Sequence, residues 1–243
     1  MNFIHKQMDI KMKSKITDGL AQYKFFLLLA LLSFTFLIIC DIICYKIVQL
    51  GPLVQPASAF MYPVSYIIGD MIAEIYGYKL ARQLIWYSLL CQLLFAVAIT
   101  LFISLPSPEY WHLQSVYNAV LGGLFRQAIA STLGIAIGLF VNAYLISTLK
   151  IRMHGKKFWV RNLIATAVGE GIVCVVCYTI LFYDKYPLQH LMHFMASAWV
   201  YKCLYATLMV GPVSLIVSYI KSKEGFDVYD YRVNYNPFKL STE

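Results

Sequence analysis

Two carboxylates four residues apart, Asp70 and Glu74, lie within a mostly apolar stretch. Residues at this spacing share one face of a helix, so the two charges repel unless a cation, a proton or a hydrogen-bond donor lies between them. A charge at the centre of a bilayer costs about 2.5–3.5 kcal/mol, so such residues usually pair or line a wet cavity. Arg126 or Lys46 from another helix would satisfy them structurally, and a substrate with several N–H donors would satisfy them functionally; both can hold at once.

Further charged residues lie within or near the edges of the apolar stretches. They are Asp41, Lys46, Arg126, Glu170 and Lys202. For Lys46 and Lys202, extension of the side chain toward the membrane surface is as good an explanation as a buried partner. The carboxylate of Asp41 is too short for that, because it lies several residues from either end of its stretch. The sequence therefore predicts a polar pocket inside a membrane protein.

The composition places these charges in a membrane. Of the 243 residues, 60% are hydrophobic and 13% are charged, against about 45–50% and about 25% in soluble domains. A spanning helix needs about 20 mostly apolar residues, and six stretches meet that requirement. They are residues 24–48, 54–76, 80–105, 116–148, 159–183 and 191–220. We predict an all-α membrane protein with six transmembrane helices; a broken or partly re-entrant helix is an alternative for the second stretch, which contains Pro56, Pro63 and Gly69.

The basic residues predict the orientation. They gather in residues 1–23, 78–83, 149–158 and 221–243. The links between the other helix ends, residues 49–53, 106–115 and 184–189, contain a single basic residue, Lys185. This alternation predicts that both ends are cytoplasmic in a bacterial inner membrane. It also means that the net charge of +8 reflects topology rather than a nucleic-acid partner. We expect residues 1–23 to form a basic tail without a cleavable signal, 24–220 the membrane domain, and 221–243 a loosely ordered tail.

No motif predicts enzyme chemistry. All six cysteines lie inside apolar stretches, and His190 and His193 lack a third metal ligand, so no metal or cofactor is expected. The phosphate-binding loop Gly-x4-Gly-Lys-Ser/Thr and the motifs His-Glu-x2-His and Gly-x-Ser-x-Gly are absent. An intramembrane enzyme acting on a lipid is an alternative, but it requires a clustered acid, base or metal constellation.

One short pattern occurs twice, 35 positions apart. The copies are Arg126-x3-Ala130-Ser131-x2-Gly134 and Arg161-x3-Ala165-Thr166-x2-Gly169. They lie on consecutive predicted helices that run in opposite directions. Small residues at these spacings let helices approach closely, and an inverted pair fits a transporter whose site lies at the repeat interface. Chance explains the repeat almost as well.

The second predicted helix resembles the signature of the queuosine precursor transporter family, also called the putative vitamin uptake transporter family. The signature residues are Pro63, Asp70, Glu74, Tyr76, Gly77 and Arg82. Weaker matches follow on the fourth helix, at Arg126-x3-Ala130-Ser131 with Gly138, and on the fifth, at Thr166-x2-Gly169. The resemblance covers about residues 24–220.

The resemblance implies a fold similar to the substrate-binding component of energy-coupling-factor vitamin transporters. It also implies uptake of 7-deazaguanine bases, such as preQ0, preQ1 or queuine, for the queuosine of tRNA. We expect secondary or facilitative transport of a purine-like substrate; the alternative is a binding subunit for another vitamin or nucleobase that needs a separate ATPase. A homodimer is one alternative for the assembly of the chain. The predicted pocket consists of Asp70, Glu74, Arg126, Ser131, Asn142 and Glu170, with Asp41 and Lys46 close by and Tyr62 and Tyr66 available for stacking.

The chain departs from the family pattern at several polar positions. Asp41 stands where the family has Asn, and Leu139 and Asn142 stand where it has Gln and Asp. On the fifth helix, Glu170 and Val173 occupy positions that are usually Gln or Asn and Asp. We therefore predict altered selectivity, for a bulkier or more cationic precursor. The alternative is a diverged member that transports another solute.

Overall fold

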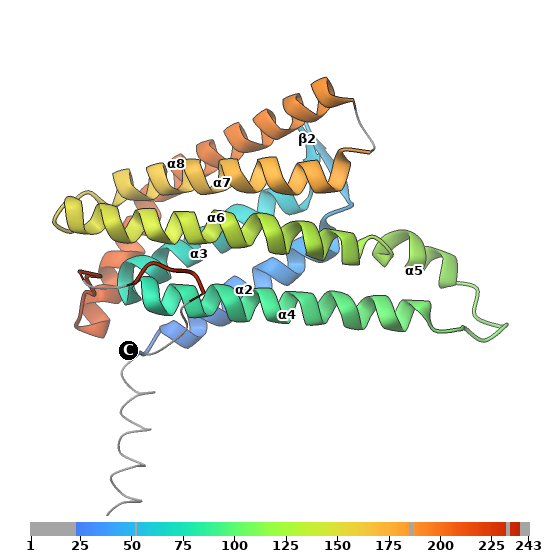
Figure 1. Cartoon of the computed structure of the whole chain (residues 1–243), viewed down its shortest axis with the longest axis horizontal. Helices are drawn as coiled ribbons and strands as arrows, with labels where there is room; N and C mark the ends of the chain where they lie inside the picture. Colours follow the sequence, from blue (N-terminus) through green and yellow to red (C-terminus); the bar gives the residue numbers. More distant parts are fainter. Residues whose placement is uncertain (1–22, 52, 185–186, 232–233, 239–243) are drawn as a thin grey trace, which may run out of the picture.

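The computed structural model describes residues 23–51, 53–184, 187–231 and 234–238. The tail predicted for residues 1–23 lies outside them, apart from Tyr23. The described chain is a bundle of long helices (Figure 1). They are α2 (Phe26–Ile43), α3 (Ser58–Tyr76), α4 (Tyr78–Ser104), α5 (Gln114–Leu121), α6 (Leu124–Arg152), α7 (Phe158–Phe182) and α8 (Leu188–Glu224).

The helices fit a membrane. Five ranges within the described residues are long and apolar enough to cross one, namely α2, α4, α5 together with α6, α7 and α8. Helix α3 carries Pro63, Asp70 and Glu74 and is less apolar, but its 19 residues extend about 28 Å, close to the thickness of a bilayer core. The all-α membrane class is confirmed. Helix α3 is continuous from Ser58 to Tyr76, so the alternative of a broken second helix is wrong.

A short β-hairpin occupies the predicted end of the first apolar stretch and the predicted start of the second. Strands β1 (Ile47–Leu50) and β2 (Leu53–Pro56) pair antiparallel, so α2 ends at Ile43 rather than at residue 48. The β-branched residues Ile47 and Val48 favour a strand, and Gly51 has φ 59°, a conformation that glycine adopts readily. We call this end of the bundle the hairpin end. The opposite end, where α3 ends and α4 and α7 begin, is the tail end.

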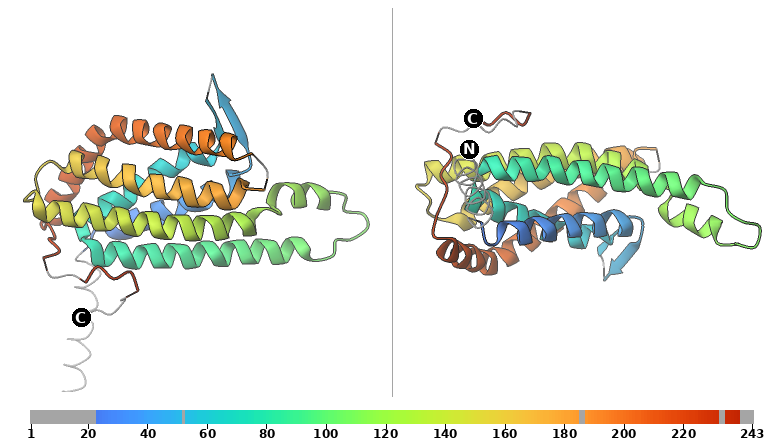
Figure 2. Two further views of the ribbon diagram at one scale, coloured as in Figure 1. Left: turned by 45° about the horizontal axis from the view of Figure 1, so that its top comes forward. Right: turned by 90° about the horizontal axis from the view of Figure 1, so that it is seen from below.

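The fourth predicted helix is divided. Helix α5 ends at Leu121, and α6 begins at Leu124 after two glycines. Helix α5 has no buried residue, and the connection from α4 to α5 projects past the other helices at the hairpin end (Figure 2). The polar column described below therefore involves α6 but not α5.

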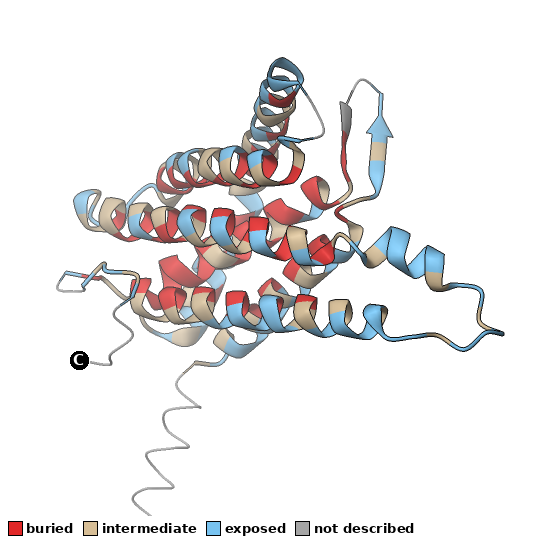
Figure 3. Cartoon of the chain, turned by 45° about the vertical axis from the view of Figure 1, so that its right-hand side comes forward, coloured by how far each residue is buried: buried red, intermediate tan, exposed pale blue. Residues whose placement is uncertain are grey.

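Polar side chains lie inside the bundle and apolar ones cover much of its outside. Helix α3 lies among α2, α4, α6 and α8, and most of its residues are buried (Figure 3). Charged residues are buried in unusual number for so apolar a chain. They are Asp41, Asp70, Glu74, Arg82, Lys150, Arg161, Glu170, Lys202 and Asp230. Such residues in membrane proteins pair with one another or line a path for a solute.

The described part of the C-terminal tail packs against the bundle, so the prediction of a loosely ordered tail is wrong there. Arg82 Nη1 donates to the carbonyl oxygens of Asn234 and Asn236 at 2.8 and 2.9 Å. Trp86 Nε1 donates to that of Pro237 at 2.8 Å. The tail thus supplies acceptors to donors on α4, where unpaired buried groups would be unfavourable.

Asp227 ties the same tail to two lysines. Its Oδ1 lies 2.6 Å from Lys150 Nζ and 2.9 Å from Lys221 Nζ. Burial raises the pKa of Asp227, but the hydrogen bonds and charges of the two lysines outweigh that effect and leave the pKa below its ordinary value. A carboxyl group with a lowered pKa contributes stability above about pH 4 and loses it as the pH falls through the folded pKa. The tail contact is therefore fully formed at neutral pH.

Asp230 allows a direct test of tail packing. Its Oδ2 accepts hydrogen bonds from Tyr78 N at 2.9 Å and Ser147 Oγ at 2.6 Å, so it caps the start of α4, where Gly77 offers no side chain. We expect Asp230→Ala to lower the free energy of unfolding by about 1–3 kcal/mol, measured by denaturation in detergent. Tyr231→Ala is the control, because that neighbouring side chain is 68% exposed. Equal effects of the two substitutions would contradict a packed tail.

Candidate functional site

A column of polar side chains runs along the buried face of α3. Tyr62, Tyr66, Asp70 and Glu74 recur every four residues, which places them on one side of the helix, and all four are buried. Their partners come mainly from α6, α7 and α8. We call this set the polar column; it consists of Tyr62, Tyr66, Asp70, Glu74, Asn142, Arg161, Asn162, Thr166, Glu170 and Lys202.

Asp70 occupies the middle of the column and is held by neutral groups. Its Oδ1 accepts a hydrogen bond from Asn142 on α6, and its Oδ2 accepts one from Asn162 on α7. Thr166 Oγ1 also donates to Oδ2, at 3.1 Å. No ion pair in the described part of the chain includes Asp70. This carboxylate is therefore oriented by neutral donors, and its charge has no fixed counter-ion there.

Glu74, one turn further toward the tail end, is surrounded by cations. Arg161 donates to both carboxylate oxygens, at 2.5 and 3.0 Å. Lys221 Nζ lies 2.6 Å and Lys150 Nζ 3.8 Å from Oε1. Arg161 also donates to the carbonyl oxygen of Gly155. These contacts link α3, α6, α7 and α8, so Glu74 closes the column at the tail end.

The prediction that Arg126 or Lys46 pairs with the carboxylates of α3 is wrong. Helix α6 begins at the hairpin end, so Arg126 in its first turn reaches the end of α7, where it donates to Ile180 O at 2.7 Å and lies 2.6 Å from Asp184. A basic side chain at that position satisfies the last carbonyl groups of a helix. Lys46 is exposed and directly precedes β1. Both lie outside the column.

Glu170 and Lys202 form a second buried ion pair, nearer the hairpin end. Lys202 Nζ donates to Glu170 Oε2 at 2.6 Å, and the two side chains are 3% and 1% exposed. The ammonium group also lies 5.4 Å from the centre of the Tyr62 ring, a favourable cation–π distance. Lys202 is thus paired inside the bundle and does not extend to the surface.

Several buried polar atoms of this region have no hydrogen-bond partner among the described residues. Such atoms are uncommon in folded proteins, and a bound water or ion is one of the groups that can satisfy them. In and beside the column they are Tyr66 Oη, Gln92 Oε1, Gln127 Oε1, Asn142 Oδ1 and Glu170 Oε1. All but the Tyr66 hydroxyl are acceptors, so the region favours a solute that donates hydrogen bonds.

Asp41 and Ser131 form a separate cluster beside the column. Gln92 Nε2 donates to both oxygens of Asp41, at 2.9 and 2.7 Å, and lies 3.1 Å from Ser131 Oγ. None of these residues hydrogen-bonds to Asp70. Of the predicted pocket residues, the structure places Asp41 and Ser131 next to the column and brings six into it, namely Tyr62, Tyr66, Asp70, Glu74, Asn142 and Glu170.

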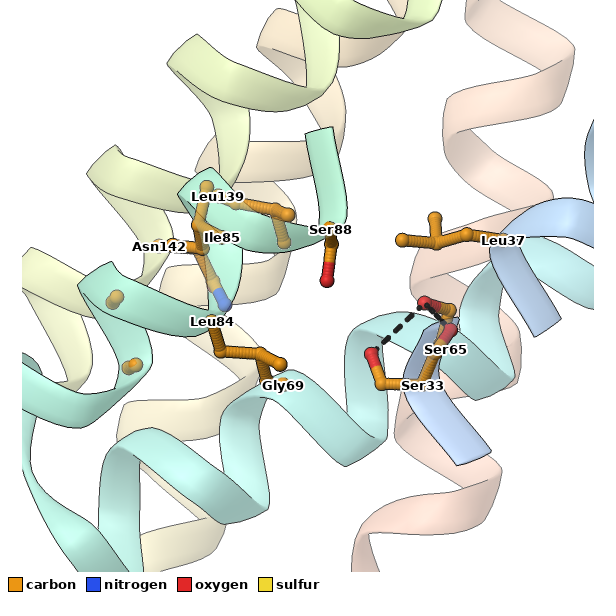
Figure 4. A pocket seen from close by; sticks show the side chains of 11 residues that line it. Ser33, Leu37, Ser65, Gly69, Leu84, Ile85, Ser88, Leu139 and Asn142 are labelled. Atoms are coloured by element: carbon orange, nitrogen blue, oxygen red, sulfur yellow. Dashed lines mark hydrogen bonds between the residues drawn. The ribbon is translucent and has the colours of Figure 1, made fainter. Parts of the chain in front are cut away.

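Two small cavities adjoin the column. Figure 4 shows the first, between α2, α3, α4 and α6, with the hydroxyl group of Ser88 directed into it and Ser33 hydrogen-bonded to Ser65. Asn142 also lines it. The second is lined by Tyr62, Gln127 and Lys202 among others. Each has about 30 Å³ available to water-sized spheres, whereas one water needs roughly 10–15 Å³. Each cavity has room for at most about two or three waters, so a bicyclic base needs the helices to separate.

Five residues of these clusters were absent from the predicted pocket, namely Gln92, Arg161, Asn162, Thr166 and Lys202. Arg161 and Thr166 did occur in the repeat, and its two helices do approach closely. A Cβ at Gly169 would lie 3.0 Å from Gly138 O and from Asn142 Cβ. Because α6 and α7 run in opposite directions, Arg126 lies at the hairpin end and Arg161 at the tail end. The second copy of the repeat thus contains Arg161 and Thr166 of the column, whereas Arg126 of the first copy lies outside it.

Comparison with known proteins identifies the family. The family model described as "Putative vitamin uptake transporter" matches residues 56–217. A Bacillus subtilis (strain 168) protein named "Probable queuosine precursor transporter" is 25% identical over 181 residues, which are 73% of this chain and 76% of that protein. No solved structure matches, so the likeness to energy-coupling-factor components stays a prediction. The matched region contains helices α3 to α7 and most of α8, and the chain belongs to the vitamin uptake transporter family.

Proposed function

We propose that this multi-pass membrane protein imports queuosine precursors, which are 7-deazaguanine bases such as preQ0, preQ1 or queuine, for tRNA modification. The observation that carries the proposal is Asp70, a buried carboxylate with three neutral donors and no counter-ion among the described residues. The guanine-like edge of these bases presents adjacent N–H groups. Oδ1 already accepts one hydrogen bond and can accept a charge-assisted one from such a group, and Oδ2 can accept the adjacent group once Asn162 or Thr166 releases it. The printed name of the Bacillus subtilis relative supports the same substrate class.

Neighbouring residues suit the rest of such a base. Asn142 Oδ1 is an unused acceptor beside Asp70, and the rings of Tyr62 and Tyr66 offer faces for stacking. Glu170 Oε1 is an unused acceptor one turn away from Thr166, suited to an amine substituent. The proposed substrate pocket thus consists of Asp70, Asn142, Tyr62, Tyr66 and Glu170. Pairing of two copies of the chain stays a prediction.

Both ends of the column are closed in the described conformation. At the hairpin end, Gln55 of β2 is buried and donates to Ser197 Oγ at 3.0 Å, and Tyr178 Oη lies 3.4 Å from its Oε1. At the tail end, Arg161 and Lys221 hold Glu74. We infer a cycle in which the two closures open in turn around a central site, as in other secondary transporters. The basic links predict that the tail end faces the cytoplasm.

The test is queuosine restoration in a bacterium that cannot make the precursors. Cells with this chain, supplied with limiting preQ0, preQ1 or queuine and the salvage enzymes for each, are expected to recover queuosine in tRNA. Asp70→Asn keeps the size of the side chain but removes its charge, and we expect it to reduce recovery at least tenfold at equal protein level. Glu109→Gln, at an exposed position outside the column, is the matched control.

Two results would count against the proposal, and a third would change the mechanism of transport. Recovery with Asp70→Asn equal to that of the unaltered chain would remove the carboxylate from substrate binding. No recovery with any base, despite membrane-inserted protein, would indicate a different solute. Recovery only with a separate ATPase present would favour the binding-subunit alternative.

A further inference from the structure

Of the carboxylates buried on the described helices, Asp41 and Asp70 have no ion-pair partner in the described part of the chain. Asp41 lies on α2 and is 1% exposed. Glu74 and Glu170 each have a basic nitrogen within 2.5–2.6 Å, but no ion pair in the described part of the chain includes Asp41. Gln92 donates to both of its oxygens, and the Gln127 side chain interacts with the same carboxylate. Amide groups orient the charge but do not neutralise it.

The neighbours of Asp41 leave oxygen atoms unused. Gln92 Oε1 and Gln127 Oε1 are both buried and have no partner among the described residues. Ser131 Oγ, 3.1 Å from Gln92 Nε2, adds a hydroxyl group. The cluster thus has several oxygen acceptors and one negative charge without compensation. A proton would neutralise the carboxylate, and a sodium ion would in addition use the amide and hydroxyl oxygens, the ligand type that hard cations prefer.

The other charged and titratable groups near Asp41 do not compensate it. Cys40 on α2 and Tyr62 on α3 interact electrostatically with Asp41, and both are ordinarily neutral at pH 7. Lys202 on α8 interacts electrostatically with Cys40, but it is held by Glu170 on α7. Helices α4 and α6 contribute the neutral side chains Gln92, Gln127 and Ser131.

We propose that Asp41, Gln92, Gln127 and Ser131 form a site for a monovalent cation, a proton or a sodium ion, that couples to solute uptake. The proposal rests on the transport function above. Gln127 also lines the cavity beside Tyr62 and Lys202, so it connects the cation site to the substrate column. Binding of the cation cancels the charge of Asp41 and lets the amide groups turn, which changes the field and the shape of that cavity.

The test uses purified protein in liposomes with labelled preQ1 or queuine. Exchange between labelled and unlabelled base needs no ion gradient, whereas accumulation does. We expect the unaltered chain to accumulate base when either an inward proton gradient or an inward sodium gradient is imposed, and the effective gradient identifies the cation. Asp41→Asn should retain exchange, while its accumulation falls at least tenfold, to simple equilibration. Glu109→Gln should accumulate normally.

Equal accumulation by Asp41→Asn, or accumulation by the unaltered chain that ignores both gradients, overturns the proposal. Failure of exchange with every base instead contradicts the transport function. In that case the cation site is tested without substrate, from the unfolding temperature in detergent. We expect the midpoint to depend on sodium (against potassium) or on pH between 5.5 and 8, and this dependence to be lost in Asp41→Asn. An identical dependence in both proteins, or none in the unaltered chain, overturns the cation site.

Discussion

Substitution of Arg161 by alanine is expected to lower the free energy of unfolding by about 3–5 kcal/mol, the cost of breaking a buried pair by removing one partner. Arg161 and Glu74 are both 0% exposed, so the glutamate would stay in the bundle with weaker partners. Lys221 is 20% exposed, and Lys150 Nζ is 3.8 Å from the carboxylate. Neither reproduces the two parallel hydrogen bonds of the guanidinium group.

Arg126→Ala is the matched control, because the repeat gives the two arginines equivalent positions. The side chains of Arg126 and Asp184 are 40% and 57% exposed, and solvent-exposed pairs contribute little to stability. Both variants would be denatured in the same detergent, and the transition midpoints compared. Equal losses would mean that Glu74 is not held mainly by Arg161. We also expect Arg161→Ala to weaken the closure at the tail end, measured as faster labelling of a cysteine substituted for Ser147, which is 1% exposed.

The identity of this ion pair illustrates what the sequence could and could not predict. The position of Asp70 and Glu74 on one apolar helix predicted that they need partners, but hydropathy does not say which cation is near. The directions of the helices contain that information. Glu74 lies in the last turn of α3 at the tail end, Arg161 lies in the first turn of α7 there, and Arg126 lies in the first turn of α6 at the hairpin end. The helix directions therefore exclude Arg126 and leave basic residues of the tail end, among them Lys150, Arg161 and Lys221, as partners of Glu74.

The tail contacts and the hairpin cannot be recognised from the side-chain types in the sequence. The tail binds Arg82 and Trp86 through backbone carbonyl groups, which every residue has, so its lack of helical periodicity wrongly predicted loose order. The hairpin interrupts what looked like one apolar stretch to residue 48, because hydropathy does not distinguish a strand from the end of a helix. The long helices were predicted closely, because their length and apolarity are set by the bilayer itself.

The second large effect concerns Lys202 and Glu170. We expect Lys202→Met to lower the free energy of unfolding by about 3–5 kcal/mol, because Glu170 would keep its charge without a partner in a site that is 1% exposed. Substitution of both residues, Lys202→Met with Glu170→Gln, should recover most of that loss, since no charge then stays buried. The two single variants and the double variant form a cycle whose coupling energy measures the pair. Additive losses would contradict an ion pair at this position.

Substitution of Glu170 alone distinguishes a structural role of this ion pair from a role of Glu170 in substrate selectivity. Lys202 engages only Glu170 Oε2, and Oε1 has no partner among the described residues, so one oxygen is left for a ligand. A hydrogen bond to a charged group contributes about 1.5–3 kcal/mol, which corresponds to a preference of roughly 10- to 150-fold for a cationic ligand. Glu170→Gln is therefore expected to reduce uptake of the aminomethyl base preQ1 by that factor relative to the neutral nitrile base preQ0, measured in the same cells at equal protein level.

Because the glutamine variant retains an acceptor of similar size, a general packing defect would lower the uptake of both bases together. Unchanged uptake and selectivity would show that Glu170 serves only to neutralise Lys202.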